Sequence, residues 1–151
     1  MQDVEYVLRY FTMLNEWQNF SGDYRRSMDR FMEENRDPGS AALKKFEKLF
    51  LTALSRCSDF WGENSFKRFD GADVRNQFLA GMFDAQMVAA TLLTQAQANA
   101  LTGKQAAIKK ATQKLFDQKG NFESWVRYAT NTKSSVKNRV QAVLDTLKSI
   151  A

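Results

Sequence analysis

The stretch AALKKFEKLFLTALSRCSDFW, residues 41–61, decides the fold class of this chain. Its large apolar side chains return every three or four residues, which is the period of an α-helix with one face turned inward. That face is wide enough to pack against two neighbouring helices. Cys57 lies on it, so we interpret Cys57 as a small core residue and not as a reactive thiol.

Further helices are predicted on both sides of this stretch. The same period, or capping residues, places them at about 3–17, 24–35, 104–119, 121–129 and from 131–132 onward. Residues 62–70 are polar and lack the period, so they predict a loop or an extended stretch. Asp70 and Asp73 then resemble a capping box, from which we expect a long central helix of nearly 30 residues that ends near Ala100.

These elements predict an all-α fold, with residues 1–151 forming a single compact bundle of about six to seven helices. One Pro and 7 Gly leave few obligatory breaks, and 12 Phe and 3 Trp supply material for one core. No apolar run is long enough to span a bilayer, so no membrane partner is expected. A single cysteine cannot form an internal disulfide, which indicates a reducing, cytoplasmic setting.

The sequence contains no histidine. This excludes an imidazole general base, a His-activated nucleophile and a His-ligated zinc ion, and one cysteine cannot supply a thiolate site. A glycine-rich phosphate loop is also missing, because Gly103 and Gly120 are isolated. We therefore expect no enzyme activity, no cofactor and no metal in this chain.

Positive charge is concentrated in the last third of the chain. Residues 1–75 hold 12 basic and 13 acidic side chains, whereas residues 76–151 hold 10 basic and 4 acidic ones. Two interpretations stay open. The lysines either form an ordinary solvated face or, if the two long helices here are adjacent, a surface that binds the duplex DNA backbone without reading its sequence. The candidate DNA-binding residues are Lys104, Lys109, Lys110, Lys114, Lys119, Lys133, Lys137 and Arg139.

Asp84 follows Phe83 within an apolar face. An unpaired charge would be costly there, because its lost hydration would not be replaced. We predict that Asp84 pairs in the interior with Arg9, Arg75 or both.

Three patches resemble the GmrSD-type family, a DUF family with a ParB/sulfiredoxin-like N-terminal domain. Residues 3–11, DVEYVLRYF, resemble its D-x-E-x-V-L-R stretch. Residues 66–84, from FKR through Arg75 and Asn76 to MFD, are similar to its second segment, although the family places one residue between that Arg and Asn. Thr132, Val136 and Arg139 match the T-x(3)-V-x(2)-R of its closing helix, with Leu147 further along. The matched positions expected to act structurally are Asp3, Glu5, Arg9, Arg75, Asn76, Phe83, Asp84 and Thr132.

Members of this family act in defence against foreign or modified DNA. Their chemistry is attributed to a D-G-Q-Q-R motif in the N-terminal domain, sometimes with a C-terminal HNH domain. Here Asp70-Gly71 is followed by Ala72 and Asp73, and no histidine is present for an HNH site. The resemblance implies the helical, non-catalytic region of such a protein, excised from a larger chain, with the parent's catalytic domain as partner.

A different class of function stays open beside it, namely a helical protein-interaction or oligomerisation module. The chain holds 19 Phe, Trp and Tyr residues, which can exceed what one small core needs. We expect Trp17, Tyr24 and Trp125 to be candidates for an exposed apolar patch of such a module.

Overall fold

The computed structural model describes residues 2–117 and 120–151 of the chain. Within these residues the chain is mostly helical and adds one short β-hairpin that the sequence did not predict. The elements are α1 (Gln2–Glu16), α2 (Tyr24–Glu34), α3 (Ser40–Trp61), the 3-10 turn η1 (Gly62–Asn64), β1 (Lys67–Asp70), β2 (Asp73–Phe78), α4 (Ala80–Leu92), α5 (Gln95–Leu101), α6 (Gln105–Asp117), the π-helical turn η2 (Ser124–Tyr128) and α7 (Lys133–Ile150).

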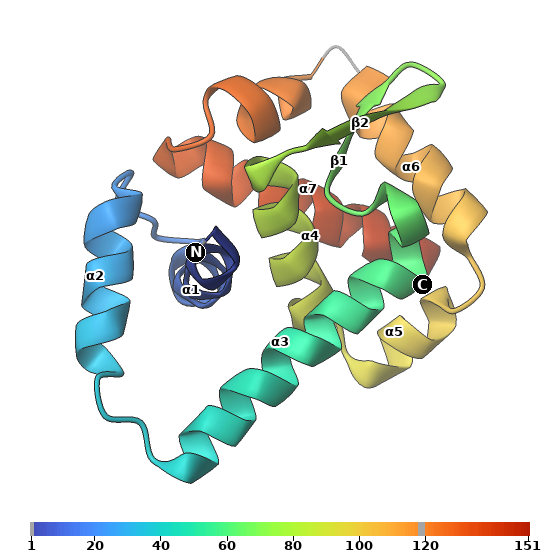
Figure 1. The fold of residues 1–151 in the computed structure, drawn as a ribbon. Coiled ribbons are helices and arrows are strands. Elements are labelled where there is room, and N and C mark those ends of the chain that lie inside the picture. Colours follow the sequence, from blue (N-terminus) through green and yellow to red (C-terminus); the bar gives the residue numbers. More distant parts are fainter. Residues whose placement is uncertain (1, 118–119) are drawn as a thin grey trace.

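Helix α4 lies at the centre of the molecule, between α1, α3 and α7 (Figure 1). All its residues from Gly81 to Ala90 are buried. Burial around the whole circumference fits its sequence, which is apolar or small on almost every side. The main core forms where α3, α4 and α7 meet.

The expected central helix of nearly 30 residues is wrong. Its first part, Asp73–Phe78, is a strand, and the extended backbone of Leu93 ends α4. Thr94 then starts α5 with a capping box, in which its hydroxyl accepts the Gln97 N–H and the Gln97 carboxamide accepts the Thr94 N–H. The central helix α4 has 13 residues, so it is only about 20 Å long.

The hairpin also corrects the expected helix cap at Asp70 and Asp73. These residues face each other across the antiparallel ladder of β1 and β2, with Gly71 and Ala72 as the turn. Gly71 has a φ of 59°, a left-handed conformation that glycine adopts without strain and that two-residue hairpin turns require. A glycine at the first of the two central positions is typical of a type II′ hairpin turn.

Two other predicted helix starts are confirmed. The Asp23 carboxylate caps α2 by accepting the Arg26 N–H at 3.0 Å, and Thr132 caps α7 by accepting the Ser135 N–H at 3.2 Å. Each cap satisfies one of the N–H groups that a helix start leaves without an intrahelical partner.

Cys57 is fully buried, with its Sγ 3.8 Å from Sδ of Met87. Burial raises the pKa of the Cys57 thiol well above its usual value, which keeps it protonated. Its interpretation as a core residue is confirmed. None of the helices described here combines the length and the hydropathy needed to cross a bilayer.

Gly81 allows α4 to pack closely against the backbone of the η2 turn. A Cβ atom at this position would lie 2.4 Å from the carbonyl oxygen of Val126 and 2.6 Å from its Cα. Both are backbone atoms, so only a residue without a side chain fits at this contact.

Candidate functional site

Asp84 of α4 forms the centre of a buried ionic cluster. Arg9 of α1 binds it twice, with Nε 2.7 Å from Oδ1 and Nη2 2.7 Å from Oδ2. Arg139 of α7 donates through Nη2 to the same Oδ2 at 2.5 Å. The side chains of Asp84 and Arg139 are fully buried. These charge-assisted hydrogen bonds, which are stronger than neutral ones, join α1, α4 and α7.

Tyr24 of α2 completes this cluster. Its hydroxyl donates a hydrogen bond to Oδ2 of Asp84 at 2.9 Å and accepts one from Nη2 of Arg139. The Arg9 guanidinium carbon lies 3.9 Å from the centre of the Tyr24 ring, within the range of a cation–π contact. Burial, together with the Asp84 carboxylate nearby, raises the pKa of Tyr24 above its usual value. The hydroxyl therefore keeps its proton and ties α2 to the cluster.

Arg139 also fastens the segment that precedes α7. Its Nη1 donates to the carbonyl oxygens of Trp125 and Thr130, at 2.8 and 2.6 Å, while its Nε has no partner among the described residues. Two guanidinium groups face one carboxylate, so the cluster holds an excess of positive charge in the interior. Burial opposes the charge of Arg9, but the Asp84 carboxylate outweighs this effect and raises the pKa of Arg9. Removing that carboxylate would leave the fully buried Arg139 and the half-buried Arg9 without a counter-charge.

The cluster is suited to holding helices together. A guanidinium group does not give up its proton in proteins, so neither arginine can act as a general acid or base. Both arginines form ion pairs with Asp84, so its carboxylate is not available to bind a substrate. Among the described residues, no group of three His, Cys, Asp or Glu side chains is placed to hold a metal ion.

The prediction that Asp84 pairs with an arginine in the interior is confirmed for Arg9 and wrong for Arg75. Arg75 instead binds Asp70 across the hairpin, with Nη2 2.8 Å from Oδ2, and both side chains are substantially exposed. The hydrogen bond and the charge of Arg75 hold the pKa of Asp70 below its usual value.

The three patches of the family resemblance meet at this cluster. Arg9 comes from the first patch, Asp84 from the second and Arg139 from the third, although up to 130 positions separate them in the chain. The other matched residues have separate places. Thr132 caps α7 and Phe83 lies in the core, whereas Asp3 and Glu5 are exposed in the first turn of α1 and Asn76 is exposed on β2.

Arg139 was expected on a basic DNA-binding surface, and this expectation is wrong. Its side chain is buried and bound to Asp84, so it cannot reach a phosphate. Lys104 is half-buried, and its Nζ donates to the carbonyl oxygen of Ile150 at 2.7 Å. Lys119 lies outside the described residues.

The remaining lysines form two groups. Lys109, Lys110 and Lys114 are exposed on α6, and Lys133 and Lys137 are exposed at the start of α7. Helices α6 and α7 do contact each other, but they meet where α6 begins and α7 ends. Figure 1 shows the start of α7 on the opposite side of the molecule from α6. The lysines therefore do not form one continuous stripe.

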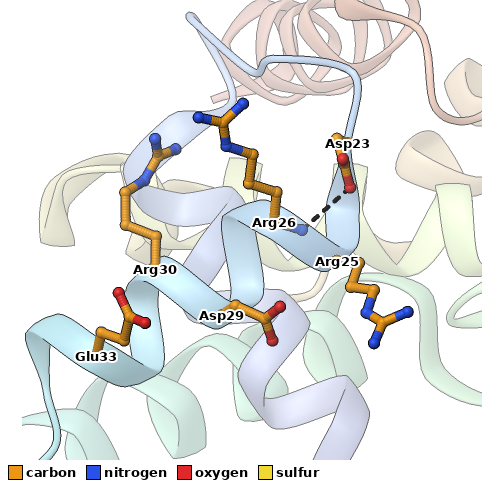
Figure 2. A pocket seen from close by; sticks show the side chains of 6 residues that line it. All are labelled: Asp23, Arg25, Arg26, Asp29, Arg30 and Glu33. Atoms are coloured by element: carbon orange, nitrogen blue, oxygen red, sulfur yellow. Dashed lines mark hydrogen bonds between the residues drawn. The ribbon is translucent and has the colours of Figure 1, made fainter.

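A charged recess of about 420 Å³ lies along the exposed side of α2. Figure 2 shows Arg26 and Arg30 extending together on one side of this helix and Arg25 on the other. Arg30 is held by Glu16, whose hydrogen bond raises the pKa of Arg30. With Asp23, Asp29 and Glu33 also in its lining, the recess carries as many acidic as basic side chains and has the character of a solvated helix face.

A second recess, of about 540 Å³, is lined mainly by aromatic rings. Its lining includes Asp3, Tyr6, Phe50, Phe66, Phe78 and Phe83, which come from α1, α3, α4 and the hairpin region. We call it the aromatic pocket. The sequence predicted a different aromatic surface, and that prediction is wrong, because Trp17 is buried, Trp125 is half-buried against the core and Tyr24 belongs to the ionic cluster.

No family model, no curated protein and no solved structure matches this chain.

Proposed function

We propose that this chain is the non-catalytic helical domain of a GmrSD-type DNA-defence protein, where it supports the N-terminal nuclease or nucleotide-hydrolysing domain. The observation that carries the proposal is the meeting of the three resembling patches in one ionic cluster. If such residues hold the helices of a family in one common arrangement, this shared structural role accounts for their recurrence in the same order along the sequence.

The chemistry of the cluster favours support over catalysis. Asp84 is enclosed by Arg9, Arg139 and Tyr24. Both oxygens of its carboxylate accept hydrogen bonds from these side chains, and the bonds join four helices. A domain of this kind gives the parent protein a rigid body against which a catalytic domain can rest. In this proposal the protein works in the reducing cytoplasm, where Cys57 stays a thiol.

The experiment begins with the gene that encodes the chain. We expect its reading frame, or an adjacent gene, to encode a ParB/sulfiredoxin-like domain with a D-G-Q-Q-R motif. The two purified domains should then co-elute in size-exclusion chromatography. A locus without such a domain, or two purified domains that elute separately, would refute this role.

A second candidate function is that of a protein-interaction module outside any defence system. The aromatic pocket favours it, because exposed clusters of large apolar side chains on a small domain often mark binding sites. The locus distinguishes the two, since a module of this class requires no catalytic domain in its parent.

A further inference from the structure

The aromatic pocket combines three features that are costly to build. The first is the backbone of Phe66, which has a φ of 63°. A bulky aromatic residue rarely adopts this left-handed conformation, and such residues persist only where their surroundings hold them in place. Here the Phe66 N–H donates to Oε1 of the buried Gln86 at 2.6 Å, and the Phe66 carbonyl oxygen accepts the N–H of Leu79 at 2.9 Å.

The second feature is a bulge in the hairpin. Lys67 lies opposite Phe78, but the next residue, Arg68, lies opposite Arg75. Asn76 and Gln77 are therefore extra residues on β2. Bulges bend a strand and redirect its side chains, and they are frequent beside functional sites. This one lies immediately before Phe78, whose ring enters the aromatic pocket.

The third feature is the exposure of an aromatic ring. Phe78 keeps 48% of its surface in contact with solvent. Its ring meets Tyr6 edge-on at 5.0 Å and lies 6.2 Å from Phe66, while Phe83 closes the floor of the pocket with only 5% exposure. Edge-to-face pairs leave ring faces open, and an open ring face attracts both apolar groups and cations.

The charge at the rim identifies the kind of occupant. Asp3, in the first turn of α1, is the charged residue in the lining of the pocket. Its side chain is exposed and makes no salt bridge within residues 2–117 and 120–151. It stands out on a chain whose net charge is +5. A carboxylate beside an aromatic floor is complementary to an apolar side chain with a cation beside it.

We propose that the aromatic pocket binds a segment of a partner protein in which a large apolar side chain neighbours an Arg or Lys. The apolar side chain enters between Tyr6, Phe66 and Phe78, and the cation pairs with Asp3. A volume of about 540 Å³ is ample for one such side chain, and it falls in the range of small-ligand sites. The residues that line the pocket include Tyr6, Phe66 and Phe78, and their arrangement supports binding whether or not the GmrSD-type resemblance holds.

Capped tripeptides test the proposal, with binding followed through the backbone amide signals of the whole chain in NMR titrations. Lys-Trp-Arg should shift the amides of Tyr6, Phe66 and Phe78 in a saturable manner. Lys-Ala-Arg lacks the anchor and Glu-Trp-Glu carries the wrong charge, so both should bind far more weakly. Equal binding of all three peptides, shifts that map elsewhere, or no binding would each overturn the proposal.

Variants sharpen the test. Phe78→Ala should weaken binding of Lys-Trp-Arg by about tenfold, as expected for the loss of an interface anchor. Asp3→Lys should reverse the preference between Lys-Trp-Arg and Glu-Trp-Glu without touching the core. Tyr128→Ala is the matched control, because Tyr128 is an aromatic residue with 67% exposure and it lies outside the pocket. A loss of binding in this control, or an unchanged preference in Asp3→Lys, would contradict the assignment.

A second copy of the chain is the remaining possible occupant of the pocket. Sedimentation velocity on the unmodified chain should show a monomer at the concentrations used for the titrations. A dimer that Phe78→Ala dissociates would overturn the proposal, since the pocket would then be an interface between two copies.

Discussion

At the scale of single residues, Arg139 shows how a charged side chain can be misassigned. It lies in the most basic part of the chain, which suggested a surface position. Yet it follows the buried Val136 by three residues and precedes the buried Val143 by four, so it shares their face of α7. That spacing was a usable signal for burial. The partner of Arg139 could not be deduced in the same way, because nothing in the sequence shows that α7 crosses Asp84.

Tyr24 provides a prediction at this scale. Its pKa is raised in the folded state, so the folded protein holds a phenolic proton that the unfolded chain releases above the ordinary value of 10.0. The stability that Tyr24 contributes is present below pH 10 and is lost as the pH rises further. We expect the free energy of unfolding, measured by urea titration between about pH 8 and 11, to fall less steeply in Tyr24→Phe than in the wild type. Tyr128→Phe, at an exposed site, is the control. Parallel alkaline slopes for Tyr24→Phe and the wild type would contradict the role of this hydroxyl.

At the scale of elements, the sequence predicts helices well where an apolar stripe and a cap agree. The ends of α1, α2 and α3 and the start of α7 fall within two residues of the predicted bounds. The prediction fails at 73–78, because Val74 and Phe78 are four residues apart and satisfy a helical period by coincidence. It fails again at Thr94, although Thr94 and Gln97 match the capping-box pattern that marks a helix start. In the site, the Arg9–Asp84 pair follows from its apolar surroundings. The aromatic pocket does not, since it depends on a bulge and on the backbone of Phe66.

The contact between α4 and η2 provides a prediction at this scale. Helix propensity alone would favour Gly81→Ala by about 1 kcal/mol. The added Cβ, however, would meet the Val126 backbone at 2.4 Å, so we expect a net destabilisation of about 1–3 kcal/mol, typical of overpacking. Thermal and urea denaturation measure it. Gly120→Ala is the control, because a Cβ atom added there would meet no atom of residues 2–117 or 120–151 within 4 Å. A Gly81→Ala protein as stable as the wild type would show that α4 and η2 are not in such close contact.

At the scale of the whole molecule, the exposed lysines of α6 can be tested separately from those of α7. If α6 contacts the DNA backbone, the chain should bind labelled duplex weakly and without sequence preference. Its affinity should fall steeply between roughly 50 and 200 mM salt. Joint reversal of Lys109, Lys110 and Lys114 to Glu should abolish most of this binding, as measured by fluorescence anisotropy, and leave the fold intact because the three side chains are exposed. Substitution of Lys133 and Lys137 by Glu tests the exposed lysines of α7 in the same assay. Binding that neither reversal changes would leave the lysines as a solubilising face.

The ionic cluster joins four helices that lie far apart in the chain, and one measurement tests this most directly. Urea denaturation should compare Asp84→Asn with Asp70→Asn, two substitutions that each remove a carboxylate bound to arginine. In Asp84→Asn the fully buried guanidinium group of Arg139 and the half-buried one of Arg9 lose their counter-charge, and we expect the free energy of unfolding to fall by about 3–5 kcal/mol. Asp70→Asn should cause a much smaller loss, because water screens its exposed pair with Arg75. Equal small losses in the two variants would contradict the claim that α1, α2, α4 and α7 are held together by Asp84.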